Sequence, residues 1–341
     1  MPQKEKIVYL GNRLSRNPRV TPATIDTLSQ NFIREGFEVI AVSNKQNKAL
    51  RLLHMILTVV KHHCSAKIVL VDTYSTQNFW YAVAVAGLCR WYKIPYIPIL
   101  HGGNLPNRLQ KSPAQSKRLF SRAKTNVAPS RYLMDSFKQA GFSNTTFIPN
   151  AIELQNYPFT QRNTVLPKLL WVRSFAEIYN PLLALKIVER LQDIFPQVQL
   201  CMVGPDKDGS MQACKSYAQS KSLPVVFTGK LDKKDWIVLS QQYDIFINTT
   251  NFDNTPVSVM EAMALGLPII TTNVGGIPFL LQHKKEALCV PPNDVEAFVE
   301  ALIMLHQTPG MARSLTLNAR KNVENCDWQK VKELWIPLLQ D

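Results

Sequence analysis

The sequence of 341 residues lacks the marks of several protein classes. It contains no apolar run of the ~20 residues that a membrane-spanning helix needs, and we expect no signal peptide. Charged residues make up 19% and hydrophobic residues 46%, which excludes disorder over most of the length. The six cysteines form no CxxC pair and no cysteine–histidine set. We therefore expect reduced, buried thiols in a cytosolic protein and no metal site.

Acidic residues are scarce in the first half of the chain. Residues 1–160 contain 21 Lys and Arg against 7 Asp and Glu, whereas residues 161–341 contain 18 of each, so the net charge of +14 lies in the first half. This asymmetry predicts one anionic partner: nucleic acid, anionic lipid or a phosphorylated substrate. Nucleic-acid binding is disfavoured because no helix-turn-helix, zinc-finger or aromatic RNA-binding signature is present.

Short β-branched runs alternate with helix-length amphipathic segments, and this alternation predicts an α/β chain with parallel, doubly wound sheets. The predicted strands are residues 7–11, 37–42, 67–72, 95–100, 125–128 and 146–148, followed by 169–172, 199–203, 225–228, 245–248, 268–271 and 287–290. The polar segment 156–168 contains two prolines and is interpreted as an interdomain linker.

Two Rossmann-like domains follow from this division, at residues 1–160 and 161–325. The final helix, 326–341, either crosses back to the first domain or packs as an ordinary helix of its own. Ligands of such folds bind at the carboxyl ends of the strands, so we expect a cleft that faces both sheets.

The most informative segment, residues 252–278, reads FDNTPVSVMEAMALGLPIITTNVGGIP. Thr255 and Pro256 predict a helix start, with the hydroxyl as N-cap and the proline at the first helical position. Asp253 then lies in the preceding loop, and Glu261 lies one to two turns inside the helix.

This segment, with the glycine pair at 275 and 276, resembles the acidic-x7-acidic signature and GlyGly loop of the retaining GT-B glycosyltransferases of family 4 (group 1). The resemblance implies the GT-B fold, with two doubly wound Rossmann-like domains facing each other across a cleft. It also implies that Glu261 accepts hydrogen bonds from the ribose of a nucleotide sugar, and that Asp253 lies near the transferred sugar. A carboxylate can accept two hydroxyls at once, which suits this role. The alternative is that both acids complement the positive end of the helix.

Neighbouring residues complete the donor site that the resemblance implies. They are Asn254, Thr255 and Val257. The family commonly has glycines after the first acid, and here Pro256 removes one backbone donor.

A second motif, residues 170–185, reads LWVRSFAEIYNPLLAL. Arg173 matches the arginine with which the family clamps the donor's pyrophosphate. Asn180 and Pro181 stand where the family has Lys-Gly, and they predict a helix N-terminus that can accept part of the phosphate charge. We expect Arg173 and this helix end to neutralise the leaving diphosphate without metal. A structural role is the alternative for Arg173.

Three further segments resemble family positions at strand ends. His101 begins a His-Gly-Gly-Asn sequence after strand 95–100, where the family places an imidazole near the donor sugar. Gly11 and Asn12 occupy the place of the family's glycine-rich loop, and Lys230 follows the Phe-x-Gly turn near the nucleotide base. The predicted catalytic residues are thus His101, Arg173 and Asp253.

Two basic features lie in the first half. Residues 108–138 contain eight Lys and Arg against one acid, and Arg108, Lys111, Lys117, Arg118 and Arg122 are predicted to bind the acceptor or a membrane. In residues 49–63, polar side chains recur at helical spacing on an otherwise apolar segment. That helix either packs on the sheet or lies on a membrane surface.

The sequence thus predicts a retaining glycosyltransferase of the hexosyltransferase type that needs no cofactor. Its predicted partners are a nucleotide-diphosphate sugar, a polysaccharide or lipid-linked glycan acceptor, and an anionic membrane surface. Its predicted place is the cytoplasm, at the inner face of the membrane. Alternatives are a nucleotide-sugar epimerase of the same fold and a non-catalytic protein that binds sugar nucleotides.

Overall fold

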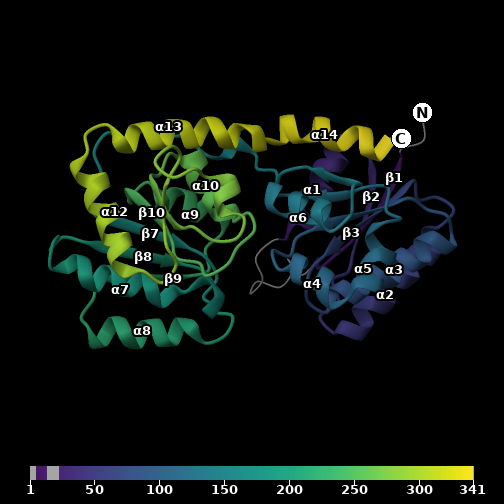
Figure 1. Cartoon of the computed structure of the whole chain (residues 1–341), viewed down its shortest axis with the longest axis horizontal. Helices are drawn as coiled ribbons and strands as arrows, with labels where there is room; N and C mark the ends of the chain where they lie inside the picture. The colour runs from purple at the N-terminus through teal and green to yellow at the C-terminus, as the bar shows by residue number, and fades with distance from the viewer. Residues whose placement is uncertain (1–4, 14–22, 341) are drawn as a thin grey trace. The chain divides into compact units, whose positions relative to one another are not determined.

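The computed structural model describes residues 5–13 and 23–340. The chain divides into two compact units, unit 1 (Met1–Ala151 with Trp328–Asp341) and unit 2 (Ile152–Asp327). The sequence placed these divisions at 160/161 and 325/326. Each unit is built on one six-stranded parallel sheet (Figure 1), and the predicted α/β class is confirmed.

The segment predicted as a linker, residues 156–168, belongs to unit 2 instead. Tyr157 is buried, and the buried Arg162 side chain donates to the backbone oxygens of Gly266 at 3.0 Å and Tyr243 at 3.1 Å. The polar composition and the two prolines predicted an interdomain linker. These side chains nevertheless anchor the segment to the second sheet and its helices.

The sheet of unit 1 has the order β2-β1-β3-β4-β5-β6. Its strands are β1 (Lys6–Leu10), β2 (Glu38–Val42), β3 (Ile68–Thr73), β4 (Tyr96–Leu100), β5 (Asn126–Ala128) and β6 (Thr145–Phe147). One face carries α2 (Lys48–His62), α3 (Asn78–Trp91), α4 (Leu105–Lys111), α5 (Pro113–Phe120) and α6 (Arg131–Gln139). The other face carries α1 (Thr24–Arg34) and α14 (Trp328–Gln340).

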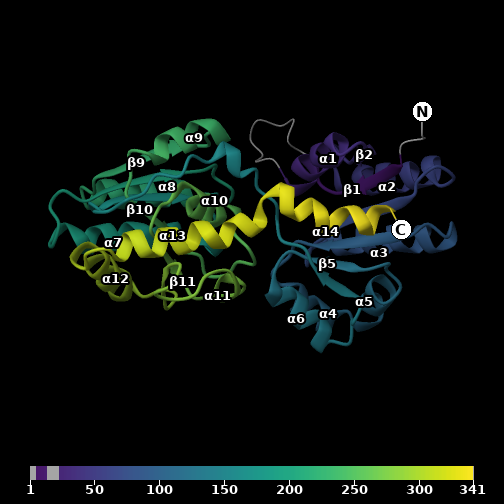
Figure 2. The same cartoon turned by 90° about the horizontal axis from the view of Figure 1, so that it is seen from above.

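Helix α14 packs on unit 1, beside α1 (Figures 1 and 2). Phe32 of α1 makes edge-to-face contacts with Trp328 at 5.8 Å and Trp335 at 5.6 Å between ring centroids. The indole N–H of Trp328 also donates to Glu35 Oε1 at 3.1 Å. Buried aromatic pairs of this kind bring the last helix of the chain onto the first sheet.

The sheet of unit 2 has the order β12-β11-β10-β7-β8-β9. Its strands are β7 (Lys168–Val172), β8 (Gln199–Val203), β9 (Val225–Gly229), β10 (Ile245–Asn248), β11 (Ile269–Thr272) and β12 (Leu288–Val290). Its helices are α7 (Pro181–Gln192), α8 (Ser210–Ser220), α9 (Lys233–Ser240), α10 (Val257–Leu265), α11 (Ile277–Leu280), α12 (Val295–Gln307) and α13 (Met311–Val323). Short 3-10 turns are η1 (Leu154–Asn156), η2 (Glu177–Tyr179) and η3 (Glu324–Cys326).

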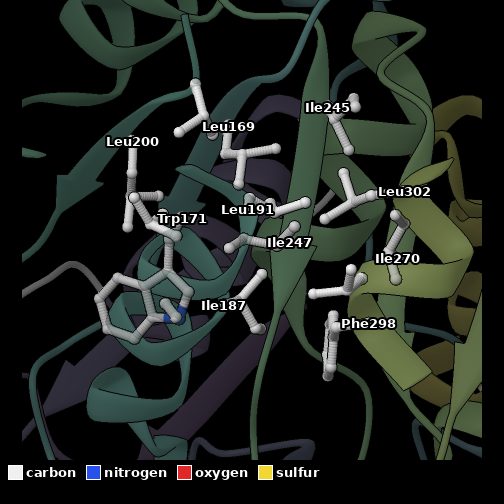
Figure 3. Packing of buried hydrophobic residues seen from close by; sticks show 14 of the residues in the cluster. Leu169, Trp171, Ile187, Leu191, Leu200, Ile245, Ile247, Ile270, Phe298 and Leu302 are labelled. Atoms are coloured by element: carbon white, nitrogen blue, oxygen red, sulfur yellow. The ribbon is translucent and has the colours of Figure 1, made fainter. Parts of the chain in front are cut away.

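Successive side chains of each strand point to opposite faces of this sheet, so both faces carry a buried core. Leu169 and Trp171 of β7 belong to one buried cluster with Ile187 of α7 and Phe298 of α12 (Figure 3). Leu170 points to the opposite face, toward α10 and α13. Strands that are buried on both faces have continuous apolar sequences. For this reason the sequence predicted both ends of all twelve strands to within one residue.

Each sheet has one point where the strand order reverses. In unit 2 it lies between β7 and β10, and in unit 1 between β1 and β3. Open α/β sheets bind ligands at the carboxyl ends of the strands beside such a point. The loops after β7 and β10, and after β1 and β3, are therefore the places to look for a site.

No helix in the described ranges is long and apolar enough to cross a membrane. All six cysteines are free thiols. Cys64 is exposed and Cys289 is partly exposed, so the expectation of uniformly buried thiols is wrong for these two.

Candidate functional site

Arg173 follows β7 directly, and its side chain contacts Asp253 and Tyr179. Its Nη2 donates to Asp253 Oδ2, and its guanidinium carbon stacks 4.2 Å from the ring centroid of Tyr179. The side chains of Arg173 and Asp253 are 18% and 12% exposed. The Nε of Arg173 is buried and has no hydrogen-bond partner within the described part of the chain. A buried donor without a partner is costly, so this atom is an unusual feature of the loop after β7.

The N-terminus of α7 lies beside this pair. Asn180 has left-handed backbone angles (φ 47°) and precedes Pro181 at the first helical position, as predicted, although its side chain makes no cap hydrogen bond. Its Nδ2 instead donates to Asn251 Oδ1 at 3.2 Å and Asn293 Oδ1 at 2.7 Å. Thr249 Oγ1 donates to the carbonyl oxygens of Tyr179 and Asn180 at 3.1 and 2.9 Å. The start of a twelve-residue helix is thus held at the switch point of unit 2.

Helix α10 begins one residue later than predicted. Pro256 has extended backbone angles (φ −67°, ψ 116°), and its oxygen accepts the N–H of Met260 at 3.2 Å, so Pro256 is the N-cap and Val257 the first helical residue. Thr255 therefore lies in the preceding loop with Asp253. A cap needs non-helical angles, which Pro256 can adopt as easily as Thr255.

Glu261 lies in the second turn of α10, and its side chain is 6% exposed. Its Oε1 accepts from the hydroxyl of Tyr157 at 2.6 Å and from Lys233 Nζ at 2.8 Å. Burial and the charge of Glu261 raise the pKa of Tyr157, which keeps that phenol protonated as a donor. Both of these bonds go to Oε1.

The glycine pair approaches the loop of Asp253 backbone to backbone. The amide of Gly276 donates to the oxygen of Asp253 at 2.9 Å. A Cβ on Gly275, which has φ +56°, would lie 2.1 Å from that oxygen, and one on Gly276 would lie 2.0 Å from the oxygen of Asn254. Glycine is required at both positions, and the two loops hold each other in place.

Other donor-site predictions lie at the same end of the sheet. Lys230 follows β9, and Val257 is 37% exposed at the start of α10. Ser258, next in that helix, has a buried Oγ that lacks a partner among the described residues. No group of three His, Cys, Asp or Glu in residues 5–13 and 23–340 is arranged to hold a metal ion.

Sequence reasoning missed three residues of this site. Tyr157 and Lys233 contact Glu261 but are far from it in the sequence. Lys207, in the loop after β8, has its pKa lowered by desolvation and by the positive charge of Arg173. Its backbone amide donates to the oxygen of Phe175 at 2.9 Å, which holds the loop after β8 against the loop that follows Arg173.

In unit 1, His101 follows β4 and is joined to a buried aspartate. His101 Nε2 lies 2.7 Å from Asp72 Oδ1, which also accepts from the hydroxyl of Tyr9 at 2.8 Å. The imidazole stacks on Tyr74 at 5.3 Å between ring centroids. Gly11 packs directly against the Asp72 carboxylate, whose buried Oδ2 has no partner in the described ranges. Asp72 was not predicted, because an acid at a strand end has no signature of its own.

Of the other residues predicted in the first domain, some are bonded within unit 1 and others are exposed. Asn12 Oδ1 accepts from Arg51 Nη1 at 2.9 Å, which fixes the loop after β1. Arg108, predicted for the acceptor or a membrane, is engaged internally, with Nε and Nη2 donating to the oxygen of Ser75 at 2.8 and 2.6 Å. The remaining four basic residues are exposed: Lys111, Lys117, Arg118 and Arg122. Arg108 thus differs from these four in its bonds to Ser75, which the charge pattern alone did not predict.

Part of the chain matches a known protein family, and the matched part includes Arg173, Asp253 and Glu261. Residues 166–308 match the family described as glycosyl transferases group 1. Sulfoquinovosyl transferase SQD2 of Arabidopsis thaliana is 28% identical over 152 residues, which are 43% of this chain and 28% of that protein. The chain therefore spans less than two thirds of this curated relative.

Two solved structures share the fold of the whole chain. Sucrose-phosphate synthase of Thermosynechococcus elongatus has a TM-score of 0.79 at 16% identity and covers 98% of this chain and 99% of its own. HepE of Anabaena in complex with UDP-glucose has a TM-score of 0.75 at 16% identity, with coverage of 98% and 99%. The predicted GT-B fold class is confirmed.

Proposed function

We propose that the chain transfers a sugar from a nucleotide-diphosphate sugar to an acceptor hydroxyl, because residues 166–308 match the family described as glycosyl transferases group 1. One observation carries this proposal. The ion pair of Arg173 and Asp253, the start of α7 and the buried Glu261 all lie around the switch point of unit 2. A cation, a helix N-terminus and a ribose-binding acid are what such a donor requires.

Each part of the donor has a matching group. Arg173, whose Nε has no partner in the described part, and the N-terminus of α7 bind the diphosphate, and Lys207 adds a second cation. Glu261 Oε2 accepts from the ribose. Asp253 and Asn254, held by the glycine pair, contact the sugar. HepE, which has this fold, was solved with UDP-glucose, and that complex supports a donor of the same class.

Bond cleavage puts charge on the departing diphosphate. Arg173 and the end of α7 stabilise that charge, and electrostatic stabilisation of this kind is a large term in catalysis. We propose that these groups suffice without a resident metal, so a chelator should leave most of the transfer rate intact.

The proposed transfer retains the anomeric configuration. Proton NMR of the product from a donor of known anomeric form should show the same form in the new linkage. An inverted product would contradict retention and would require a general base, for which His101, held by Asp72, is the candidate. Epimerised donor without acceptor would favour an epimerase, and an unchanged donor would favour a non-catalytic binding protein.

We also propose that the acceptor is a polysaccharide or a lipid-linked glycan at the cytoplasmic face of a membrane. Unit 1 contains the whole excess of positive charge, and Lys117, Arg118 and Arg122 are exposed on or beside α5. Each Lys or Arg near an anionic leaflet contributes ~1 kcal/mol. Peripheral association would bring the site to a membrane-linked substrate.

A further inference from the structure

Helix α2 presents a row of apolar side chains to solvent. Leu50, Leu53, Leu57 and Val60 are 55%, 50%, 55% and 37% exposed. Their spacing of three, four and three residues places them on one stripe of the helix. An ordinary surface helix turns polar side chains to solvent, whereas α2 buries Met55 and Val59 in the core and exposes a second apolar stripe.

The polar residues of α2 fix this orientation by pointing inward. Arg51 is buried and donates to the oxygens of Lys45 at 2.8 Å and Gln46 at 3.1 Å, in addition to its bond with Asn12. His54 Nδ1 lies 3.0 Å from Ser43 Oγ. The helix therefore cannot rotate its leucines inward without leaving a buried guanidinium unpaired, which is costly.

Helix α3 packs beside α2 on the same face of the sheet and adds two tryptophans. Trp80 is 46% exposed and Trp91 is 82% exposed. They are eleven residues apart, which places them on one side of the helix. The other four tryptophans of the chain are buried. Exposed tryptophan is characteristic of the boundary between the headgroups and the acyl chains of a bilayer.

The charge around this surface identifies its occupant. Between Glu38 and Asp135 the sequence has fourteen Lys and Arg but a single acid, Asp72, which is buried under His101. Lys48 and Lys61, at the two ends of α2, are exposed. An apolar stripe within a surface rich in Lys and Arg is complementary to an anionic lipid bilayer, whose headgroups and acyl chains match the two parts.

We propose that the Leu-Trp face (Leu50, Leu53, Leu57, Val60, Trp80 and Trp91) inserts into the boundary of an anionic membrane. The surrounding Lys and Arg bind its headgroups. This inference deepens the peripheral membrane association proposed above, because it names the inserting side chains and requires a component of binding that salt does not remove.

Co-sedimentation with lipid vesicles tests whether the Leu-Trp face inserts. The vesicles contain phosphatidylcholine alone or phosphatidylcholine with phosphatidylserine. The variant is Leu53→Gln with Leu57→Gln, and the matched control is Leu317→Gln with Leu334→Gln, whose leucines are 43% and 46% exposed on α13 and α14. The partition coefficient should fall about a hundredfold in the variant, or about tenfold per leucine. The control should bind like wild type.

A salt series separates insertion from charge attraction. At about 1 M salt, where the Debye length is about 3 Å, wild type should keep part of its binding and the leucine variant none. The variant with Lys117, Arg118 and Arg122 all changed to Ala should lose the salt-sensitive part. If this triple variant loses binding and the leucine variant does not, membrane association stands and the insertion is refuted. Absence of binding to any vesicle would refute both.

Tryptophan fluorescence gives an independent measurement. Brominated acyl chains should quench wild type, and Trp91→Phe should lose most of that quenching. Unquenched fluorescence in sedimenting protein would overturn the insertion. A dimer in gel filtration that Leu53→Gln with Leu57→Gln abolishes would also overturn it, because the face would then be a protein interface.

Discussion

Replacement of Arg173 by alanine should slow sugar transfer about 10²–10³-fold, the loss typical of removing one preorganised group that stabilises developing charge. Donor binding should weaken less, because the diphosphate gains charge as the bond to the sugar breaks. The change also leaves Asp253 without its cation. Steady-state kinetics would separate the effect on kcat from that on KM.

Two variants complete this test. Arg173→Lys keeps the charge but loses the planar contact with Tyr179 and the bond geometry of the guanidinium, so it should recover only part of the rate. Arg190→Ala removes an exposed arginine of α7 that pairs with Glu296 at 3.0 Å, and it should leave the rate unchanged. Full activity in Arg173→Ala would exclude this residue from the phosphate site.

Replacement of Gly276 by alanine should weaken nucleotide binding more than tenfold. The new Cβ would lie 2.0 Å from the oxygen of Asn254, so the loop of Asp253 and Asn254 must move away from Arg173. Overpacking of this kind costs about 1–3 kcal/mol in stability. Isothermal titration with the nucleotide and a thermal unfolding curve would measure the two effects separately.

Gly87→Ala is the matched control for this change. Gly87 lies inside α3 with no atom closer than 3.9 Å to its added Cβ, so alanine should be neutral or slightly stabilising there. Normal nucleotide affinity in Gly276→Ala would show that the contact between the two loops is not needed for the donor site.

Local patterns predicted the fold and part of the site. Apolar runs predicted the strands. Turn residues close together in the sequence predicted that Asp253 lies in a loop and Glu261 in a helix. Arg173 was found because its segment resembles the strand-end arginine motif of the family. For such residues, short-range physics determines where the side chain lies.

The remaining features depend on contacts between distant segments. Tyr157 approaches Glu261 across 104 positions, and Asp72 meets His101 and Tyr9 only when three strands are aligned. Periodicity identified α2 as a helix, but its outward face was set by the bonds of Arg51 to loops outside the helix. Hydrophobic spacing shows that a helix has two sides and does not show which side faces water.

Thermal stabilisation by nucleotide diphosphates tests the central claim most directly. A ligand at about 100 times its Kd stabilises the fold by ~2.7 kcal/mol, so at least one nucleotide should raise the Tm of wild type by several degrees. Glu261→Ala should lose ~1.5–3 kcal/mol of that binding, typical of hydrogen bonds to a charged acceptor, while Tyr157→Phe keeps the carboxylate and most of the shift. If no nucleotide stabilises wild type, or if folded Glu261→Ala is stabilised equally, the donor site in unit 2 is wrong.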